Sequence, residues 1–480
     1  MSLPDPRKIV QVLMDNATRG SWPIIEDACP WVAAGPCEPH VSSLEVKDML
    51  ALPFFKELTK KVHCVRKFIL HHQTPLAVFR EVSDGMLTTP AGTRMGTMFY
   101  AFESFLKHLD AITQTLVSLK VVQYVRGNSS QKATPDSQAL GDQYKEAKEF
   151  ATDPFLASAL EFALCVLRPV ILLLRLSDSD KATASKIQYA KYEVQENLKS
   201  IQPDPENMPW SDGEYDWSTM QQEIISIHRY RWDYGYTIVQ GTGYLLDPEF
   251  VDMDQHQDAE TMASFRAFTA KTFYVDQLVE NPTPEQKAAH EQLVAESLRK
   301  QAAAAASLLD YKLKRGTWAV PAIWEGAKTM AAADFWFLNG SGDKELQLVA
   351  MRSTGQVSGM GSSERAHKVM NFVETKLRNR MLWSNVEAWT YIQHNSHQVD
   401  KREKLGHEAL NIAWSEGVEE NSEWEDAWHP EEEGEMVKTA RIASSAARAQ
   451  CIGSAADRRI IPTRSAVREG RLTAPDRLEI

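Results

Sequence analysis

Residues 362–395 read SSERAHKVMNFVETKLRNRMLWSNVEAWTYIQHN and predict two helices. Ser362 or Ser363 begins the first helix, because a serine hydroxyl accepts a hydrogen bond from an unpaired N–H of the first turn. Ser384-Asn385 offers the same cap to the second helix. Apolar side chains recur at helical spacing on one face of the first helix, at Val369, Phe372, Val373 and Leu377. The pattern alone indicates a helical hairpin with an apolar face.

A short apolar run near the other end of the chain, Lys8–Met14, predicts a buried strand. Asp15 follows it directly. A carboxylate just past the carboxyl end of a strand is where α/β folds place reactive groups. An Asp-Asn pair in this position also makes turns and caps helices, so this alternative stays open.

Cys37 and His40 form a second candidate site. Both residue types bind zinc, but a zinc site needs about four ligands and no second Cys/His pair lies nearby in the sequence. A structural cysteine and histidine are therefore the simpler interpretation. A helix is expected to open just afterwards, at Ser42.

Taken together, these segments resemble the hAT superfamily of DNA transposases. The dimerisation region of that family has a Ser-Glu-Arg start, a Lys-Arg-Asn-Arg-Leu block and an aromatic helix that ends near an Asn. The matching residues here are Ser363-Glu364-Arg365, Leu377–Met381 and Trp389–Asn395. The family also has an Asp-Asn pair followed by Cys-x-x-His, and Asp15 and Cys37 are 37 − 15 = 22 positions apart.

The resemblance implies a ribonuclease-H-like fold in which three carboxylates hold two divalent metal ions for DNA strand cleavage and joining. Asp15 matches the second carboxylate and Glu364 the third. Both would bind Mg²⁺, a hard cation that prefers oxygen ligands. Glu364 in the first turn of a helix would also stabilise the helix dipole. The resemblance gives motif and structural roles to four residues, Cys37, His40, Ser363 and Arg365. It implies that His40 organises the active-site region.

In the family, the first carboxylate lies on an earlier strand, upstream of the matched region, and a zinc-finger DNA-binding module accompanies it. Neither has a counterpart in this chain. We therefore expect a protein that is catalytically inactive by itself and retains no cofactor. Mg²⁺ would be needed only if another chain supplied the missing strands.

The resemblance also implies partners and a location. Self-association, as a homodimer or a larger homo-oligomer, is expected through residues 326–396, with contacts from Phe372, Leu377, Trp383, Trp389 and Tyr391. DNA is a second expected partner, in the nucleus, with phosphate contacts from Arg94, Arg378 and Arg380. A nucleic-acid binder usually has a basic surface, and the formal net charge of −12 does not fit this pattern. The net charge does not exclude a local basic patch.

The composition fits a large globular chain of 480 residues, with 43% hydrophobic and 25% charged residues. No apolar run reaches the roughly 20 residues that span a bilayer, so we expect no membrane association. Five scattered cysteines indicate a reducing compartment.

The predicted fold class is α/β and mostly helical, a partial ribonuclease-H-like domain interrupted by a large all-helical insertion. The partial domain is expected at 1–40 and the insertion at 41–325. The dimerisation region at 326–396 would complete the domain. A mostly disordered tail, acidic and then rich in Arg, Ser and Ala, would follow at 397–480. Within the insertion, Gly127–Gly141 is expected to be a loop because it is rich in polar, turn-forming residues.

Two further functions remain open from the sequence. One is an active metal-dependent transposase or nuclease, if the missing N-terminal strands are supplied. The other is a helical scaffold without a nucleic-acid role, which the negative charge favours.

Overall fold

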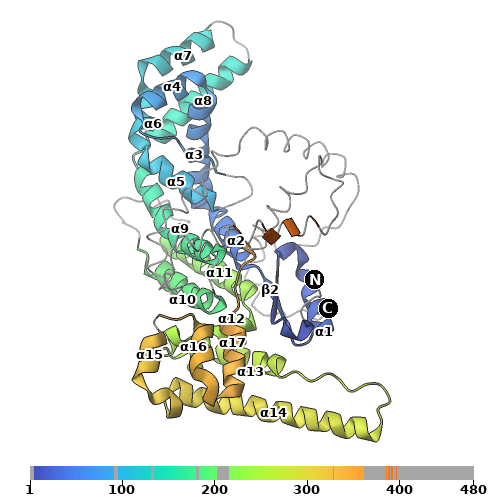
Figure 1. Ribbon diagram of the computed structural model, residues 1–480. Coiled ribbons are helices and arrows are strands. Elements are labelled where there is room, and N and C mark those ends of the chain that lie inside the picture. The colour runs from blue at the N-terminus through green and yellow to red at the C-terminus, as the bar shows by residue number, and fades with distance from the viewer. Residues whose placement is uncertain are drawn as a thin grey trace. The chain divides into compact units, whose positions relative to one another are not determined.

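The computed structural model describes residues 5–90, 96–130, 135–179, 183–202, 216–327 and 329–361, and six residues of a later helical stretch, Asn385, Ala388, Trp389, Tyr391, Ile392 and Ser396. All of them belong to one unit of the chain, Met1–Val418. They form mostly helices, together with one small sheet (Figure 1). The predicted class, α/β and mostly helical, is confirmed at this coarse level.

A two-stranded parallel sheet lies near the start of the described chain. Strand β1 (Gln11–Met14) pairs with β2 (Ala33–Pro36) in a register that aligns both ends of the two strands. The 3₁₀ turn η2 (Asn16–Ser21) and helix α1 (Trp22–Ala28) connect them. A connection of this length is needed because parallel strands cannot be joined by a tight turn.

The prediction of a strand near the N-terminus is correct in type but wrong in extent. Lys8, the first residue of the predicted strand, lies in the 3₁₀ helix η1 (Pro6–Lys8), and β1 begins only at Gln11. All four residues of β1 are half-buried instead of buried, because within the described chain β2 is its one partner. Strand β2 has little signal in the sequence, since Ala-Ala-Gly-Pro carries low strand propensity.

The helices after the sheet enclose a first hydrophobic cluster, which draws on residues 46–224. Helices α3, α4, α6, α7 and α8 lie together (Figure 1). Their buried side chains, among them Phe68, Phe79 and Leu116, belong to this cluster. The helices of this cluster are α2 (Glu38–Leu50), α3 (Pro53–His71), α4 (Gln73–Val82), α5 (Thr97–Lys107), α6 (Leu109–Val117), α7 (Leu119–Ser130), α8 (Pro135–Ala151), α9 (Leu156–Asp178), α10 (Ala184–Ser200) and α11 (Trp217–Gly235).

A second hydrophobic cluster takes in β2 and the later helices. At its centre, Tyr311 lies 5.1 Å from Trp318 and 4.7 Å from Trp336 between ring centroids. The Tyr311 hydroxyl and the Trp336 indole N–H both donate to the carbonyl oxygen of Leu246. The elements here are α12 (Ile238–Leu246), η3 (Pro248–Phe250), η4 (Gln255–Gln257), α13 (Ala259–Thr272), α14 (Pro284–Lys312), η5 (Gly316–Ala319), α15 (Pro321–Ala327), α16 (Ala332–Asn339), η6 (Gly340–Gly342) and α17 (Lys344–Thr354).

The prediction of a loop at Gly127–Gly141 is wrong at both ends of this range. Helix α7 continues through Ser130, and α8 begins at Pro135. The physical reason is packing. Leu140 and Ala147 of α8 enter the first cluster, and the Tyr144 hydroxyl donates to the carbonyl of Leu116 at 2.9 Å. Tertiary contacts therefore override a weak local propensity.

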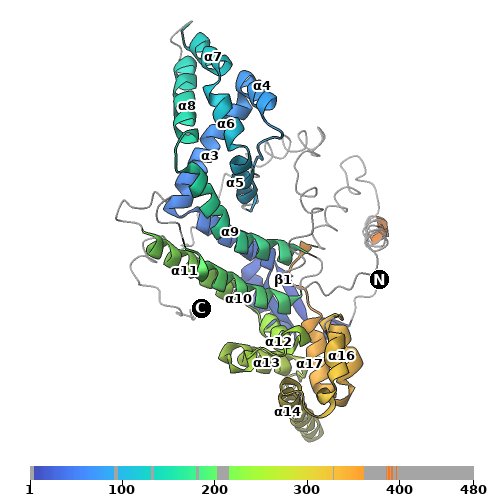
Figure 2. The ribbon, with the colours of Figure 1, turned by 90° about the vertical axis from the view of Figure 1, so that its left-hand side faces the viewer.

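Among the described residues, one long helix, α9, is strongly apolar. It is 23 residues long, continues through Pro169 and is, by length and composition alone, apolar enough to cross a membrane. However, 67% of its most apolar window is buried inside the protein, where α2, α5 and α10 pack against it (Figure 2). A core helix has this pattern of burial, so α9 is only weak evidence for a membrane span.

Candidate functional site at the carboxyl end of the sheet

The two strands end at the same edge of the sheet, and the first residue beyond each is one that the sequence singles out. Asp15 follows β1, and Cys37 follows β2. The Cys37 N–H donates to the carbonyl oxygen of Met14 at 2.9 Å, which extends the strand pairing by one residue. Asp15 therefore occupies the position just past the carboxyl end of a parallel strand.

The Asp15 side chain faces His40. Asp15 is the N-cap residue of η2, yet its carboxylate makes no capping hydrogen bond, and Thr18 bonds to its main-chain carbonyl instead. The carboxylate Oδ2 lies 3.9 Å from Nε2 of His40, with the two side chains 51% and 37% exposed. His40 lies in the first turn of α2, which begins at Glu38 and not at Ser42 as expected. The Asp15 carboxylate therefore lies between the His40 imidazole and solvent.

Residues 356–361, here called the return segment, come back to this edge after α17. The Ser358 carbonyl accepts a hydrogen bond from the Glu38 N–H at 3.0 Å. The Met360 N–H donates to Sγ of Cys37 at 3.2 Å. Because Cys37 is only 1% exposed, its thiol anchors the return segment inside the protein. This role agrees with the structural interpretation of Cys37 and not with a zinc ligand.

A glycine allows the return segment to pass close to its neighbours. A Cβ added at Gly359 would lie 2.5 Å from the carbonyl oxygen of Ser177 and 3.1 Å from Cγ of Pro39. The first distance is well below any real Cβ contact. The segment therefore lies between the end of α9 and the first turn of α2, and a side chain at this position would push it away.

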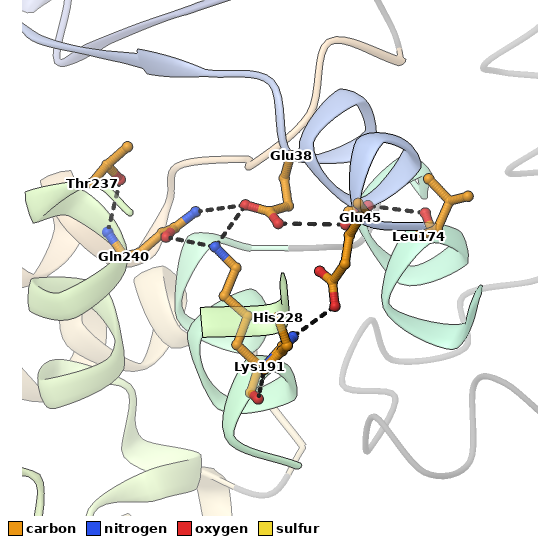
Figure 3. A network of polar contacts seen from close by, with 9 residues as sticks. Glu38, Glu45, Leu174, Lys191, His228, Thr237 and Gln240 are labelled. Carbon is orange, nitrogen blue, oxygen red and sulfur yellow. Dashed lines mark hydrogen bonds and ion pairs between the residues drawn. The ribbon is translucent and has the colours of Figure 1, made fainter. Parts of the chain in front are cut away.

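A buried ionic network holds the first turns of α2 from inside the protein (Figure 3). Nζ of Lys191 on α10 lies 2.8 Å from Oε2 of Glu38, and the two side chains are only 2% and 1% exposed. Gln240 on α12 donates to the same carboxylate oxygen at 3.3 Å. Two turns along α2, Glu45 lies 2.7 Å from Nδ1 of His228, whose Nε2 donates to the Lys191 carbonyl at 3.1 Å.

The network fixes the position of the Cys-Glu-Pro-His motif. Burial raises the pKa of Glu38, and the Lys191 ammonium beside it opposes that rise. A buried ion pair adds little net stability, because the desolvation of two charges offsets much of their attraction. The members of the network come from four helices, however, so it sets where α2 begins relative to α10, α11 and α12. The motif is thereby held between this network and the return segment.

The described part of the chain does not by itself offer a magnesium site. No three His, Cys, Asp or Glu side chains gather there closely enough to hold a metal ion. Asp15 supplies one carboxylate, and its partner His40 offers a nitrogen ligand that Mg²⁺ does not favour. Glu364, the other expected ligand, lies outside the described residues. No chemical step through a metal ion follows from the residues at this edge.

Most of the expected DNA-contact and interface residues also lie outside the described residues, namely Arg94, Phe372, Leu377, Arg378, Arg380 and Trp383. The motif residues Ser363 and Arg365 lie outside them as well. Two of the expected interface residues are described. Trp389 and Tyr391 are helical and each is 59% exposed, next to Ile392, which is 57% exposed. Exposed aromatic side chains of this kind are enriched in the centre of protein interfaces.

Sequence reasoning missed the residues that position the motif, which are Lys191, Gln240 and Gly359. Lys191 has a detectable signal, because it interrupts an apolar face of α10 that includes Ile187 and Val194. A lysine in such a stripe predicts a buried acidic partner. Its identity cannot be predicted, since Glu38 lies 191 − 38 = 153 positions away.

No protein-family model matches the chain, and no curated protein is significantly similar to it.

Proposed function

We propose that this protein derives from a hAT-type DNA transposase, that it self-associates and binds DNA, and that it does not cleave DNA by itself. The observation that carries the proposal is the contact between Asp15 and His40, 3.9 Å apart at the carboxyl edge of the parallel strands. The family resemblance singles out this pair, although the two residues are 40 − 15 = 25 positions apart.

The order of elements supports the finer fold assignment, a ribonuclease-H-like domain with a helical insertion. The strand pair comes first, the helices α2–α17 follow, and the return segment then comes back to the sheet edge. Glu364 follows Gly361, the end of that segment, by three residues. The family resemblance makes Glu364 the best candidate for a second carboxylate at this edge.

The proposed lack of cleavage rests on the number of carboxylates. Asp15 and Glu364 match two catalytic positions of the family, which uses three to hold its two metal ions. A pair of carboxylates leaves one anchor of such a site unfilled. We expect weak binding of Mg²⁺ and no strand cleavage by this chain alone.

The proposed interactions rest on different residues. Self-association is assigned to the region around Trp389 and Tyr391, whose side chains are exposed. DNA binding is assigned to Arg94, Arg378 and Arg380. With a net charge of −12, any DNA contact has to come from such a local basic group, and it should weaken steeply with salt.

Analytical ultracentrifugation of the full chain tests self-association. We expect a concentration-dependent dimer or larger assembly in the micromolar range, weakened by Trp389→Glu. Tyr230→Glu is a matched control, because Tyr230 is a 56% exposed aromatic residue on α11. A chain that stays monomeric throughout this range, or one weakened equally by both substitutions, contradicts the proposal.

A plasmid assay tests the DNA part of the proposal. With supercoiled DNA and Mg²⁺ or Mn²⁺, we expect no nicking but salt-dependent retention of DNA, reduced by Arg378→Ala and Arg380→Ala. Nicking that disappears in both Asp15→Ala and Glu364→Ala would overturn the inactive assignment in favour of an active nuclease. Failure to retain DNA at any salt concentration would favour a helical scaffold.

A further inference from the structure

Helix α3 is strongly basic, although the net charge of the whole chain is −12. Its 19 residues include five lysine and arginine side chains and a single carboxylate, that of Glu57. Four basic side chains recur at steps of four, three and four, which places them along one face of the helix. These side chains, here called the basic stripe, are all exposed and are Lys56, Lys60, His63 and Lys67.

Packing fixes the direction in which the basic stripe faces. The buried side chains of α3, among them Phe55, Val62 and Ile69, belong to the first hydrophobic cluster. Helix α8 packs on another side of α3 (Figure 2). Lys61, which lies outside the stripe, pairs with Asp153 at 2.7 Å. The stripe occupies the side of α3 that these contacts leave exposed.

Most of the charge of the basic stripe is not neutralised by the part of the chain that the structure describes. There, neither Lys56 nor Lys67 forms an ion pair. Nζ of Lys60 lies 3.9 Å from Oε1 of Glu146 on α8, and the two side chains are 61% and 46% exposed. An ion pair that is so long and so exposed contributes little. The stripe therefore presents positive charge to solvent.

Arg66 adds a buried cation beside the basic stripe. It is only 6% exposed. Its guanidinium donates to the Thr89 hydroxyl at 2.9 Å, and Nη1 lies 3.5 Å from Nδ1 of His63. Among the described residues no carboxylate pairs with it, and its Nε has no hydrogen-bond partner. Buried charges are normally paired. Because Thr89 and His63 are exposed, the guanidinium lies just below the surface, where an anion can approach it.

The composition of this face favours a phosphate backbone over a protein or a membrane. Every residue of α3 is described, and no large apolar side chain among them is exposed. Protein interfaces have apolar and aromatic centres and are depleted in lysine, and a helix that lies on a membrane buries an apolar face. The stripe runs for eleven residues, about 16 Å, over which one strand of B-DNA carries about five phosphates.

We propose that the basic stripe of α3, with Arg66 beside it, binds the phosphate backbone of duplex DNA. The choice of DNA as the source of the phosphates rests on the function proposed above, whereas the charge of the stripe does not. The stripe is a further DNA surface, separate from Arg94, Arg378 and Arg380. Its contacts do not read the base sequence, because lysine contacts to phosphates position a protein on DNA without recognising bases.

Anisotropy of a fluorescent DNA duplex, titrated with the full chain at several salt concentrations, tests the stripe. Each phosphate contact contributes about −0.9 to the slope of log K against log salt. Lys56→Gln/Lys67→Gln should therefore make the slope shallower by about 1.8 and weaken binding at least about tenfold at about 0.1 M salt. Lys287→Gln/Lys344→Gln removes two charges from exposed lysines of α14 and α17 and should leave the slope unchanged.

The possible failures have different signatures. Equal slopes for the two double variants overturn the assignment of α3, and they leave the proposed DNA binding intact as long as the wild type binds. A wild type that binds no duplex at any salt concentration overturns the proposed DNA binding itself. Loss of binding to phosphatidylserine vesicles in the stripe variant, with DNA binding unchanged, would assign the stripe to a membrane surface instead. Circular dichroism checks that all variants keep their helices.

Photochemical cross-linking tests the contact without relying on a loss of binding. Lys60→Cys, labelled with a thiol-reactive photochemical cross-linker, should become attached to the duplex above the background that the native cysteines give in the wild type. Lys287→Cys labelled in the same way should not exceed that background. Equal yields from the two variants would show that the contacts are not concentrated on α3 and would overturn the proposal.

Discussion

Lys191 is buried with the carboxylate of Glu38, and this pair holds the first turn of α2. Lys191→Met removes the cation and leaves the buried Glu38 carboxylate without a charged partner. We expect the free energy of unfolding to fall by about 3–5 kcal/mol. Urea unfolding followed by circular dichroism measures the change.

A double variant tests whether that loss comes from the unpaired charge. In Glu38→Gln/Lys191→Met, two neutral side chains of similar volume replace the ion pair, and no charge is left buried. Most of the lost stability should therefore return. Equal losses in the single and double variants would show that the shape of the lysine matters more than its charge.

Asp247 gives the stability of the protein a dependence on pH. Burial raises its pKa from 3.8 to about 6, and the hydrogen bond from Ser185 opposes the rise. Because the pKa is higher in the folded state, this contribution to stability is fully present below about pH 4 and is lost as the pH rises through about 6. The shift of roughly 2 units corresponds to about 3 kcal/mol.

Substitution of Asp247 with asparagine should remove this dependence. The new amide can accept the hydrogen bond of the Glu249 N–H through its oxygen and donate to the Ser185 hydroxyl through its nitrogen, but it cannot ionise. Urea unfolding between pH 4 and 7 should show a smaller decline in the free energy of unfolding for Asp247→Asn than for wild type. Parallel declines would show that other groups cause the dependence.

At the scale of elements, the return segment depends on the absence of a side chain at Gly359. Gly359→Ala would force the segment away from Ser177 and weaken the hydrogen bonds that reach Cys37 and Glu38. We expect a loss of about 1–3 kcal/mol in the free energy of unfolding. The buried Cys37 should also react faster with a thiol reagent.

A second glycine provides the control for that substitution. A Cβ added at Gly127 on α7 meets nothing within 4 Å. Gly127→Ala should leave Cys37 unreactive and raise helix stability by up to about 1 kcal/mol. If both variants exposed Cys37 to the same degree, the tight passage at Gly359 would not be the cause.

Sequence patterns predict some elements well and others poorly, for physical reasons. A long run of strong helix formers, such as the alanines of α14, predicts a helix from composition. Strand β2 has four residues of low strand propensity, and it exists because it pairs with β1. The sequence at the start of α8 favours a loop. The helix forms because Leu140 and Ala147 pack into the first cluster.

The candidate site divides in the same way. Asp15, Cys37 and His40 were found because they follow strands or form a short motif, both of which are local features. Lys191 and Gly359 act through partners far away in the sequence, and the sequence alone does not show which residues these partners are. The residues at the edge of the sheet can therefore be predicted from local sequence patterns. The residues that hold this edge in position become visible only in the packed structure.

At the scale of the molecule, α10 joins the two hydrophobic clusters. Ala184 at its start belongs to the second cluster, while Ile187 and Val194 belong to the first. Lys191, on the same helix, carries the ionic network that reaches α2, α11 and α12. This shared helix gives a physical reason why all of the described residues fall within one unit.

The contact between Cys37 and Met360 joins residues 323 positions apart. A ribosome that adds about 5–20 residues per second needs roughly 16–65 s to travel from one to the other. Throughout that time Asp15 and His40 have already been synthesised, but the segment that seals Cys37 has not. The hydrogen bond from Met360 to Cys37 can therefore form only late in synthesis, after helix α17 has been made.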